Sequence, residues 1–235
     1  MQVLVTGAGR GGTNLVAAIL RSFQNVVFDS GTEDRLFFTK SKLPSEYGAK
    51  LCTENPSFSM GNIRRMMKSN PNLKLIFSVR HPIDHCMSKI VRGQPNSNPL
   101  SDSSEIHGSP DGSLVTAIDA ITFMHTMRRD LSKRYPNRIL VVKMEDIILD
   151  LDNTIAQIAD FIEVDHGTIQ EDKLFDNLKN RHHKKRYGNK LDSSQINIYK
   201  RVETAYDGFF KDKEDYMDQI KSKLADVFEE LKYGI

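Results

Sequence analysis

The stretch that decides the fold is Gln2–Leu20, with the sequence QVLVTGAGRGGTNLVAAIL. Its first part, Val3–Val5, is apolar and rich in β-branched residues, which predicts a buried strand. The glycines that follow are Gly7, Gly9, Gly11 and Gly12. Residues Leu15–Leu20 then place apolar side chains at helical spacing. A strand, a glycine-rich turn and a helix predict an anion-binding site, because glycine lets backbone N–H groups approach oxygen atoms and a helix N-terminus carries partial positive charge.

The nucleoside triphosphate loop, G-x-x-x-x-G-K-[ST], is one interpretation of this turn. Gly7 and Gly12 have its spacing, but Thr13 and Asn14 stand at the lysine and hydroxyl positions. In that loop the lysine reaches the β- and γ-phosphates and the hydroxyl holds Mg²⁺. The stretch therefore argues against a nucleoside triphosphatase.

The dinucleotide fingerprint, G-x-G-x-x-G, is a second interpretation. Gly7, Gly9 and Gly12 match it in full, and Asp29 follows the apolar run Val26–Phe28 at the place of a ribose-binding acid. Many nicotinamide-dependent short-chain dehydrogenases begin in this way. They also carry a Tyr-x-x-x-Lys pair, and no tyrosine of this chain has a lysine four residues later. An NAD(P)-binding oxidoreductase of the Rossmann type stays open as an alternative.

A second informative stretch lies further along the chain. Leu73–Val79 is almost continuously apolar, which predicts a central parallel strand buried on both faces. Arg80 follows it, and Pro82 and Asp84 suit the first turn of a helix. Arg80 and Ser88 together predict a two-point anion clamp, because a guanidinium is a planar fork of donors and serine adds a hydroxyl. The alternative is that Arg80 only forms an ion pair with Asp84.

Both stretches resemble motifs of the sulfotransferase family. The segment Arg10–Leu15 resembles the 5′-phosphosulfate loop, a basic residue followed by S-G-T-T-x-L, with Gly11 replacing the serine and Asn14 the second threonine. The segment Arg80–Ser88 resembles the 3′-phosphate motif R-[DN]-P-x-[DE]-x-x-x-S, with His81 replacing the asparagine or aspartate.

The resemblance implies an α/β fold, a single domain over residues 1–235 whose central parallel sheet is flanked by helices, as in P-loop nucleotide-binding proteins. It implies 3′-phosphoadenosine 5′-phosphosulfate (PAPS) as the sulfuryl donor and a hydroxyl or amine of a small-molecule or carbohydrate acceptor. No metal is implied, because neither loop offers the Mg²⁺ ligands. A non-catalytic nucleotide-binding module, which would keep the anion-binding residues and lack a base, is a further alternative.

The resemblance also assigns roles to individual residues. Arg10 replaces the family's lysine and is expected to act in catalysis by stabilising charge on the bridging oxygen of the donor. The residues expected to bind the donor are Arg10, Gly11, Gly12, Thr13, Asn14, Arg80 and Ser88, together with Lys185, Arg186, Tyr187 and Gly188 of a late basic loop. A solvated surface or a nucleic-acid patch is the alternative for this loop.

The general base has three candidates. Glu33 precedes a pair of phenylalanines, where the family places a catalytic carboxylate in K-E-x-x-[FY]-F, but with one residue more than the family spacing. Asp34 is therefore nearly as suitable. Glu54 stands where other family members have a histidine in K-T-H-x-P. We select Glu33, because the neighbouring aromatic rings would shield its carboxyl group from water and raise its pKa.

Composition excludes several broad classes. The 235 residues carry a net charge of +2, which gives no global case for a nucleic-acid partner. The two cysteines, Cys52 and Cys86, have no paired spacing, which fits a reduced compartment. We expect no signal peptide, because the first residues already predict a strand, and no apolar run approaches the roughly 20 residues of a membrane span. The expected location is cytoplasmic.

Periodicity predicts the remaining elements. Strands are expected at residues 26–28, 51–53 and 138–143, and helices at 60–69, 114–135, 152–162, 194–206 and 213–231. Residues 92–113, rich in Gly, Pro, Ser and Asn, are expected to form a long loop. The residues Met144–Ile147, which follow the last of these strands, resemble the family's Y-E-D-L with methionine replacing tyrosine.

Overall fold

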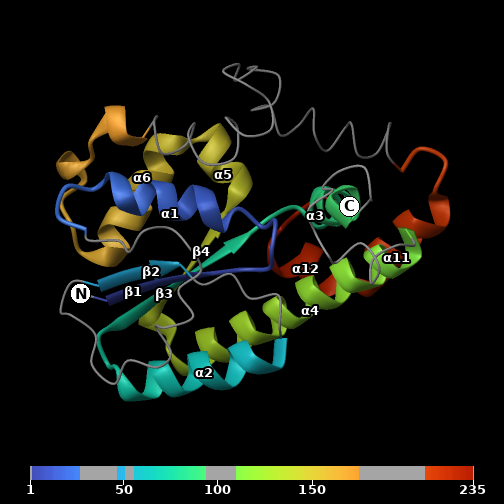
Figure 1. Ribbon diagram of the computed structural model, residues 1–235, viewed down its shortest axis with the longest axis horizontal. Helices are drawn as coiled ribbons and strands as arrows, with labels where there is room; N and C mark the ends of the chain where they lie inside the picture. Colours follow the sequence, from blue (N-terminus) through green and yellow to red (C-terminus); the bar gives the residue numbers. More distant parts are fainter. Residues whose placement is uncertain (1, 27–46, 51–55, 94–109, 175–209, 235) are drawn as a thin grey trace.

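The fold is an open parallel sheet with helices against both faces (Figure 1). The computed structural model describes residues 2–26, 47–50, 56–93, 110–174 and 210–234. Within these ranges four strands form one sheet in the order β2-β1-β3-β4. Their bounds are Gln2–Thr6 (β1), Tyr47–Lys50 (β2), Leu73–Val79 (β3) and Ile139–Lys143 (β4). The predicted central parallel sheet flanked by helices is confirmed.

Strand β3 has the central position that its apolar sequence predicts. It pairs with β1 from Leu73 opposite Gln2 to Phe77 opposite Thr6, and with β4 on its other side. All the pairings are parallel. Because parallel strands all end at the same edge of a sheet, the segments that follow β1, β3 and β4 gather there.

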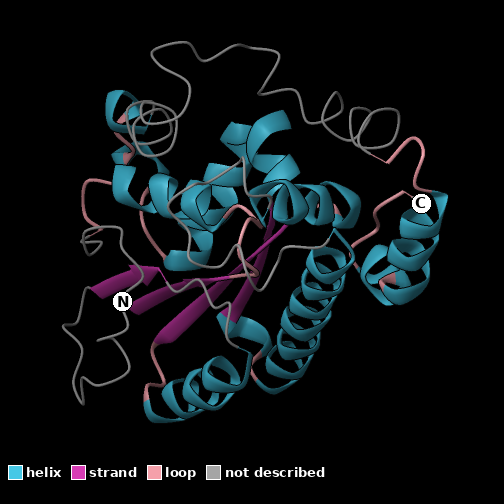
Figure 2. Cartoon of the chain, turned by 45° about the vertical axis from the view of Figure 1, so that its right-hand side comes forward, coloured by secondary structure: helices cyan, strands magenta, loops and turns pink. Residues whose placement is uncertain are grey.

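The two faces of the sheet bury different helices, as Figure 2 shows with the strands between helical layers. Leu4, Leu75 and Phe77 pack against α2 (Pro56–Ser69) and α4 (Pro110–Arg134). Val5 and Ile76 point to the opposite face and pack against α1 (Thr13–Ser22) and α6 (Leu151–Ile162). The alternation follows from the two-residue period of a strand.

A third apolar cluster lies beyond the carboxyl edge of the sheet. It joins α3 (Pro82–Gly93) and α4 to α11 (Glu214–Lys223) and α12 (Ala225–Glu230). Its buried members include Ile83, Ile90, Ile121, Leu224 and Phe228. The C-terminal helices are therefore packed beside the segment that follows β3. The remaining helix, α5 (Met144–Leu149), directly follows β4.

The strand beside β1 was not predicted from the sequence. It is Tyr47–Lys50, whereas apolar content favours residues 26–28 and 51–53. Val26 lies in no strand, and residues 27–28 and 51–53 lie outside the described residues. The pairing of β2 with β1 is made by the backbone, so at the edge of the described sheet it does not require an apolar run.

Several helix and strand ends also differ from the predictions. Strand β4 begins at Ile139, because Arg138 ends a short 3₁₀ helix and donates to the carbonyls of Leu73, Met67 and Asn70 at 2.8–2.9 Å. The loop expected at residues 92–113 is wrong at both ends, since α3 continues to Gly93 and α4 begins at Pro110. Residues 94–109 lie outside the described residues.

The helix predictions that fall on described residues are confirmed with modified limits. Helix α2 begins at Pro56 instead of residue 60. The predicted C-terminal helix is divided at Leu224, which lets its apolar side chains stay buried against α3 and α4. The helix expected at residues 194–206 lies outside the described ranges. No helix in the described part of the chain has both the length and the apolar content needed to cross a membrane.

Candidate functional site

The order of the strands places the point where the chain connections diverge between β1 and β3. The chain leaves β1 for β2 on one side, then returns past β1 to form β3 on the other. Helices α1 and α2, which make these two connections, lie on opposite faces of the sheet (Figure 1). Ligands of open α/β sheets bind at the carboxyl edge where such connections diverge. The glycine loop after β1 and Arg80 after β3 meet at this point.

Two positions of the loop require glycine for structural reasons. A Cβ atom at Gly7 would lie 2.5 Å from the backbone oxygen of Ser78, so glycine allows β1 and β3 to approach closely. Gly12 precedes α1 with φ 95°, and a Cβ there would meet Met144 at 3.0 Å. The loop is therefore fitted against the ends of both β3 and β4.

Three side chains from β3, α3 and the segment between them hold three successive carbonyl groups of the loop. The donor atoms are Ser78 Oγ to the Gly11 oxygen at 2.7 Å, Arg80 Nη1 to the Arg10 oxygen at 3.1 Å and His85 Nε2 to the Gly9 oxygen at 2.8 Å. Sequence reasoning identified Arg80 and missed the other two. Ser78 carried one signal, as a polar residue within an apolar strand, whereas no spacing pointed to His85.

This arrangement orients the backbone N–H groups of the loop. In a trans peptide the N–H of the next residue points opposite to the carbonyl. The N–H groups of Arg10 and Gly12 therefore point away from β3 and α3. The N–H of Gly11 donates within the loop to the Ala8 oxygen at 2.9 Å, which closes the turn. Thr13 and Asn14 form the first turn of α1, the positively polarised end of that helix.

Arg80 forms a buried ion pair with Asp84. The Arg80 side chain is 6% exposed and the Asp84 side chain is fully buried, and both Nε and Nη2 of the guanidinium contact Asp84 Oδ2. The ion pair with Asp84, which is the alternative interpretation of Arg80, is therefore present in the structure. The pair still leaves hydrogen-bond capacity for an anion, because Nη1 and Nη2 each carry a second N–H.

Arg10 and Ser88 connect the two predicted anion-binding segments. Arg10 Nε donates to Ser88 Oγ at 3.2 Å, although the two residues are 78 positions apart. Arg10 has φ 74°, a left-handed conformation that is uncommon for a residue with a side chain. The glycine loop and the Arg80–Ser88 segment therefore form one continuous site.

Other predicted site residues lie outside the described ranges. They are the candidate bases Glu33, Asp34 and Glu54, and Lys185, Arg186, Tyr187 and Gly188 of the late basic loop. Sequence reasoning also missed Glu145, which is 8% exposed and whose Oε1 accepts the backbone N–H of His81 at 2.7 Å. Burial raises the pKa of the Glu145 carboxyl group.

A small cavity lies between the loop and α4. It has a volume of about 30 Å³ and is lined by Gly7, Ser78 and His85 on one side and by His125 and Arg128 of α4 on the other. A space of this size holds about one water molecule. The cavity is therefore too small to hold a nucleotide.

The environment of His85 predicts a specific response to acid. Burial lowers the pKa of His85 to about 3, despite the hydrogen bond to the Gly9 carbonyl. A carbonyl only accepts, so Nε2 carries a hydrogen, and the lowered pKa keeps the ring neutral at neutral pH. Below pH 6.5 the unfolded chain binds a proton on this histidine that the folded chain does not bind until about pH 3. The stability of the fold therefore falls as the pH falls through this range.

We expect this one group to remove about 2 kcal/mol from the free energy of unfolding between neutral pH and about pH 5, at about 1.4 kcal/mol for each pH unit below the unfolded pKa. Chemical denaturation at both pH values measures the loss. His85→Gln, whose amide can still donate to Gly9, should be the less acid-sensitive protein. An equal loss of stability in both proteins would show that His85 is not the group that titrates.

The chain resembles a known protein family in sequence and known structures in fold. The model of the sulfotransferase domain family matches residues 1–234. A search of curated protein sequences gives no significant match. Among solved structures, mouse sulfotransferase SULT7A1 complexed with PAP (3′-phosphoadenosine 5′-phosphate) aligns with a TM-score of 0.66 at 15% identity. That alignment covers 100% of this chain and 89% of the mouse chain.

Two further structures have the same fold. The sulfotransferase domain from the curacin biosynthetic pathway aligns with a TM-score of 0.51 at 14% identity, over 79% of this chain and 80% of its own. Retinol dehydratase in complex with androsterone and inactive cofactor PAP aligns with a TM-score of 0.50 at 14% identity, over 94% of this chain and 80% of its own. The family match extends over nearly all of the sequence, and the chain belongs to the sulfotransferase domain family.

Proposed function

We propose that this protein transfers a sulfuryl group from PAPS to a hydroxyl or amine of an acceptor molecule. The proposal rests on the observation that the two predicted anion-binding segments contact each other. Arg10 lies 3.2 Å from Ser88, and Arg80 lies 3.1 Å from a carbonyl of the loop. PAPS has a 5′-phosphosulfate and a 3′-phosphate, so a protein that binds it requires two anion-binding sites at a fixed separation.

The glycine loop would hold the 5′-phosphosulfate. Its carbonyls are bound by Ser78, Arg80 and His85, so the N–H groups of the same peptides point to the opposite side in a fixed orientation, where we propose that sulfate and phosphate oxygens bind. The start of α1 at Thr13 adds the positive end of the helix dipole. Arg10 is part of the loop, and its charge would stabilise the bridging oxygen as the S–O bond breaks.

The 3′-phosphate would bind at the second anion-binding site, which Arg80 and Ser88 form. Arg80 would donate its remaining N–H groups, and Ser88 would donate its hydroxyl. Lys185 and Arg186, together with Tyr187 and Gly188, are proposed to cover this phosphate, as the basic loop does in the family. A surface that binds nucleic acid is the competing assignment for these residues, and we do not propose it.

The reaction would be an in-line displacement on sulfur. The acceptor oxygen or nitrogen attacks, the bond from sulfur to the bridging oxygen breaks, and PAP leaves while the acceptor proton passes to the base, for which we propose Glu33. Positioning and charge neutralisation supply most of the rate enhancement in such transfers. No metal is part of the proposal, because Asn14 stands where the triphosphate loop has the hydroxyl that holds Mg²⁺.

The acceptor is proposed to be a small molecule or a carbohydrate. Support comes from retinol dehydratase, which has the same fold and was crystallised with androsterone. We further propose that residues 1–235 act as one domain in the cytoplasm. The buried, unpaired thiol of Cys86 is compatible with a reduced compartment.

Calorimetric titration with PAP, NADP and ATP tests the proposed function. We expect PAP to bind most tightly, because only PAP carries a 5′-phosphate and a 3′-phosphate on a single nucleoside. Tightest binding of NADP would favour an oxidoreductase, and tightest binding of ATP a triphosphate-dependent protein. PAP binding together with no turnover of PAPS across a panel of hydroxyl and amine acceptors would favour a non-catalytic nucleotide-binding module.

A further inference from the structure

The last residues of the chain turn back onto the segment that carries Arg80. Helix α12 ends with a two-bond cap in which the N–H of Tyr233 donates to the Phe228 oxygen at 2.9 Å and the N–H of Lys232 donates to the Glu229 oxygen at 3.1 Å. Lys232 has φ 52°, a left-handed conformation usually left to glycine at this position. The cap reverses the chain and directs Tyr233 toward α5.

Tyr233 is held by polar and charged groups of the strand-end region. Its hydroxyl donates to Glu145 Oε2 at 3.1 Å, and the ammonium group of Lys143 lies 4.7 Å from the ring centre. Burial and the adjacent Glu145 carboxylate raise the pKa of Tyr233, so the hydroxyl keeps its proton and remains a donor. The tyrosine ring also contacts the ring of His81 edge-to-face, with 5.1 Å between centres.

Glu145 transmits this contact to the residue after Arg80. While Oε2 accepts from Tyr233, Oε1 accepts the backbone N–H of His81 at 2.7 Å. The carbonyl of Gly234 lies 3.3 Å from His81 Nε2, a second link between the chain end and this residue. His81, which precedes α3, is thus attached by its side chain to a residue 153 positions later in the chain and by its backbone N–H to Glu145.

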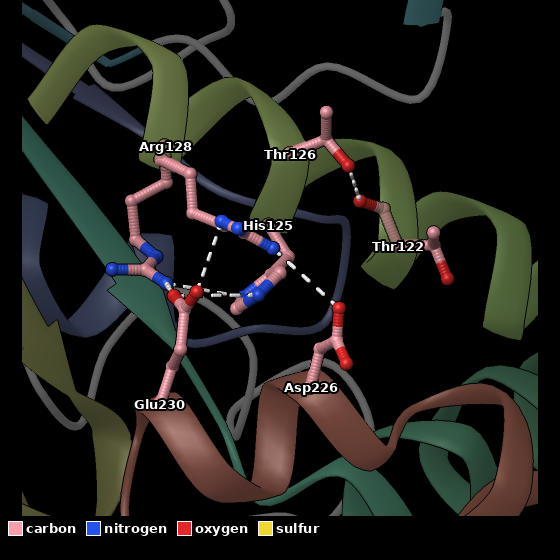
Figure 3. Close-up of polar contacts among 7 residues, drawn as sticks. Thr122, His125, Thr126, Arg128, Asp226 and Glu230 are labelled. Carbon is pink, nitrogen blue, oxygen red and sulfur yellow. Dashed lines mark hydrogen bonds and ion pairs between the residues drawn. The ribbon is translucent and has the colours of Figure 1, made fainter. Parts of the chain in front are cut away.

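The C-terminal helix is itself fixed to α4, as Figure 3 shows. Glu230 forms ion pairs with Arg128 and with Arg129, the latter at 2.9 Å, and lies 3.4 Å from His125 Nε2. Asp226 contacts Arg129 at 3.5 Å. Since Glu230 ends α12, these contacts set the position from which Tyr233 reaches Glu145.

We propose that Tyr233 is a positioning residue for the 3′-phosphate site, which Arg80 and Ser88 form. Through Glu145 it fixes the N–H of His81, and with it the backbone from which the Arg80 side chain extends. Among the described residues Tyr233 makes no hydrogen bond to Arg80 or to the glycine loop. The loop also keeps its own donors, Ser78 and His85, so the effect of Tyr233 is expected mainly on the 3′ side of the ligand. This inference rests on the proposed function, because it assumes that Arg80 binds a phosphate.

The test compares two ligands and two tyrosines. Tyr233→Phe removes the hydroxyl and keeps the ring. We expect its affinity for PAP to fall roughly fivefold, the scale of one hydrogen bond, while its affinity for adenosine 5′-phosphate is unchanged. Tyr135→Phe is the matched control, because Tyr135 is also partly buried beside a cation, Arg138, at the opposite end of β4. It should change neither affinity.

Hydrogen exchange at the His81 amide gives an independent readout. This amide should exchange about tenfold faster in Tyr233→Phe than in Tyr135→Phe, because the Glu145 acceptor is no longer fixed. If the unaltered protein does not distinguish PAP from adenosine 5′-phosphate, the proposed function fails and exchange alone decides whether Tyr233 positions His81. Unchanged exchange, or an equal loss of affinity for both ligands, overturns the inference.

Discussion

Replacing Arg80 with alanine is expected to lower the free energy of unfolding by about 3–5 kcal/mol, the cost of leaving a buried charge without its partner. Asp84 is fully buried and Arg80 provides its ion pair. The substitution also removes the donor to the Arg10 carbonyl in the glycine loop. Urea denaturation at neutral pH measures the loss. A decrease below about 1 kcal/mol would show that the ion pair contributes little.

A double substitution separates this structural role from ligand binding. Arg80→Met combined with Asp84→Leu replaces the buried pair by apolar side chains, which often restores most of the lost stability. We expect the double variant to fold and to retain weak affinity for adenosine 5′-phosphate, but to lose the added affinity that the 3′-phosphate gives to PAP. If it binds PAP as the unaltered chain does, Arg80 does not bind the 3′-phosphate.

The second large effect concerns the base. Glu33→Gln is expected to lower kcat by about 10²-fold, the usual contribution of a positioned general base, while the affinity for PAP is unchanged. Steady-state kinetics of sulfuryl transfer, together with PAP titration, separates these two quantities. Glutamine keeps the size of the side chain and removes its ability to accept the acceptor's proton.

Two further variants serve as controls for Glu33. Asp34→Asn and Glu54→Gln should each keep kcat within about threefold, an effect much smaller than the loss of a base. A full kcat in Glu33→Gln with a large loss in Glu54→Gln would place the base after the next strand, at the position of the family's histidine. A large loss only in Asp34→Asn would move the assignment by one residue.

The sequence predicts those helices and strands whose bounds depend on the residue types within the element itself. Strand β3 begins and ends where its apolar run does, at Leu73 and Val79, because both faces of a central parallel strand are buried. Helix α3 starts at Pro82, which suits the first turn. Strand β2 at Tyr47–Lys50 was missed, because an edge strand is selected by backbone pairing with β1, which leaves little trace in hydrophobicity.

The candidate site likewise has parts that the sequence predicts and parts that it does not. The glycine turn and the Arg80–Ser88 motif could be found from spacing and residue type. The contacts that shape the site could not, because they join distant positions: Ser78 and His85 bind loop carbonyls 67 and 76 residues away. Glu145 lay within a stretch resembling a family motif, but its contacts with His81 and Tyr233 depend on how β4 and α12 meet α3.

The central claim is that the site recognises a nucleotide by its 3′-phosphate as well as its 5′-phosphate. Calorimetric titration of the unaltered chain with PAP and with adenosine 5′-phosphate tests it most directly, because the two ligands differ only in that group. We expect PAP to bind about 30-fold more tightly, which corresponds to roughly 2 kcal/mol from charge-assisted hydrogen bonds to Arg80 and Ser88. Equal affinities for the two nucleotides would contradict it.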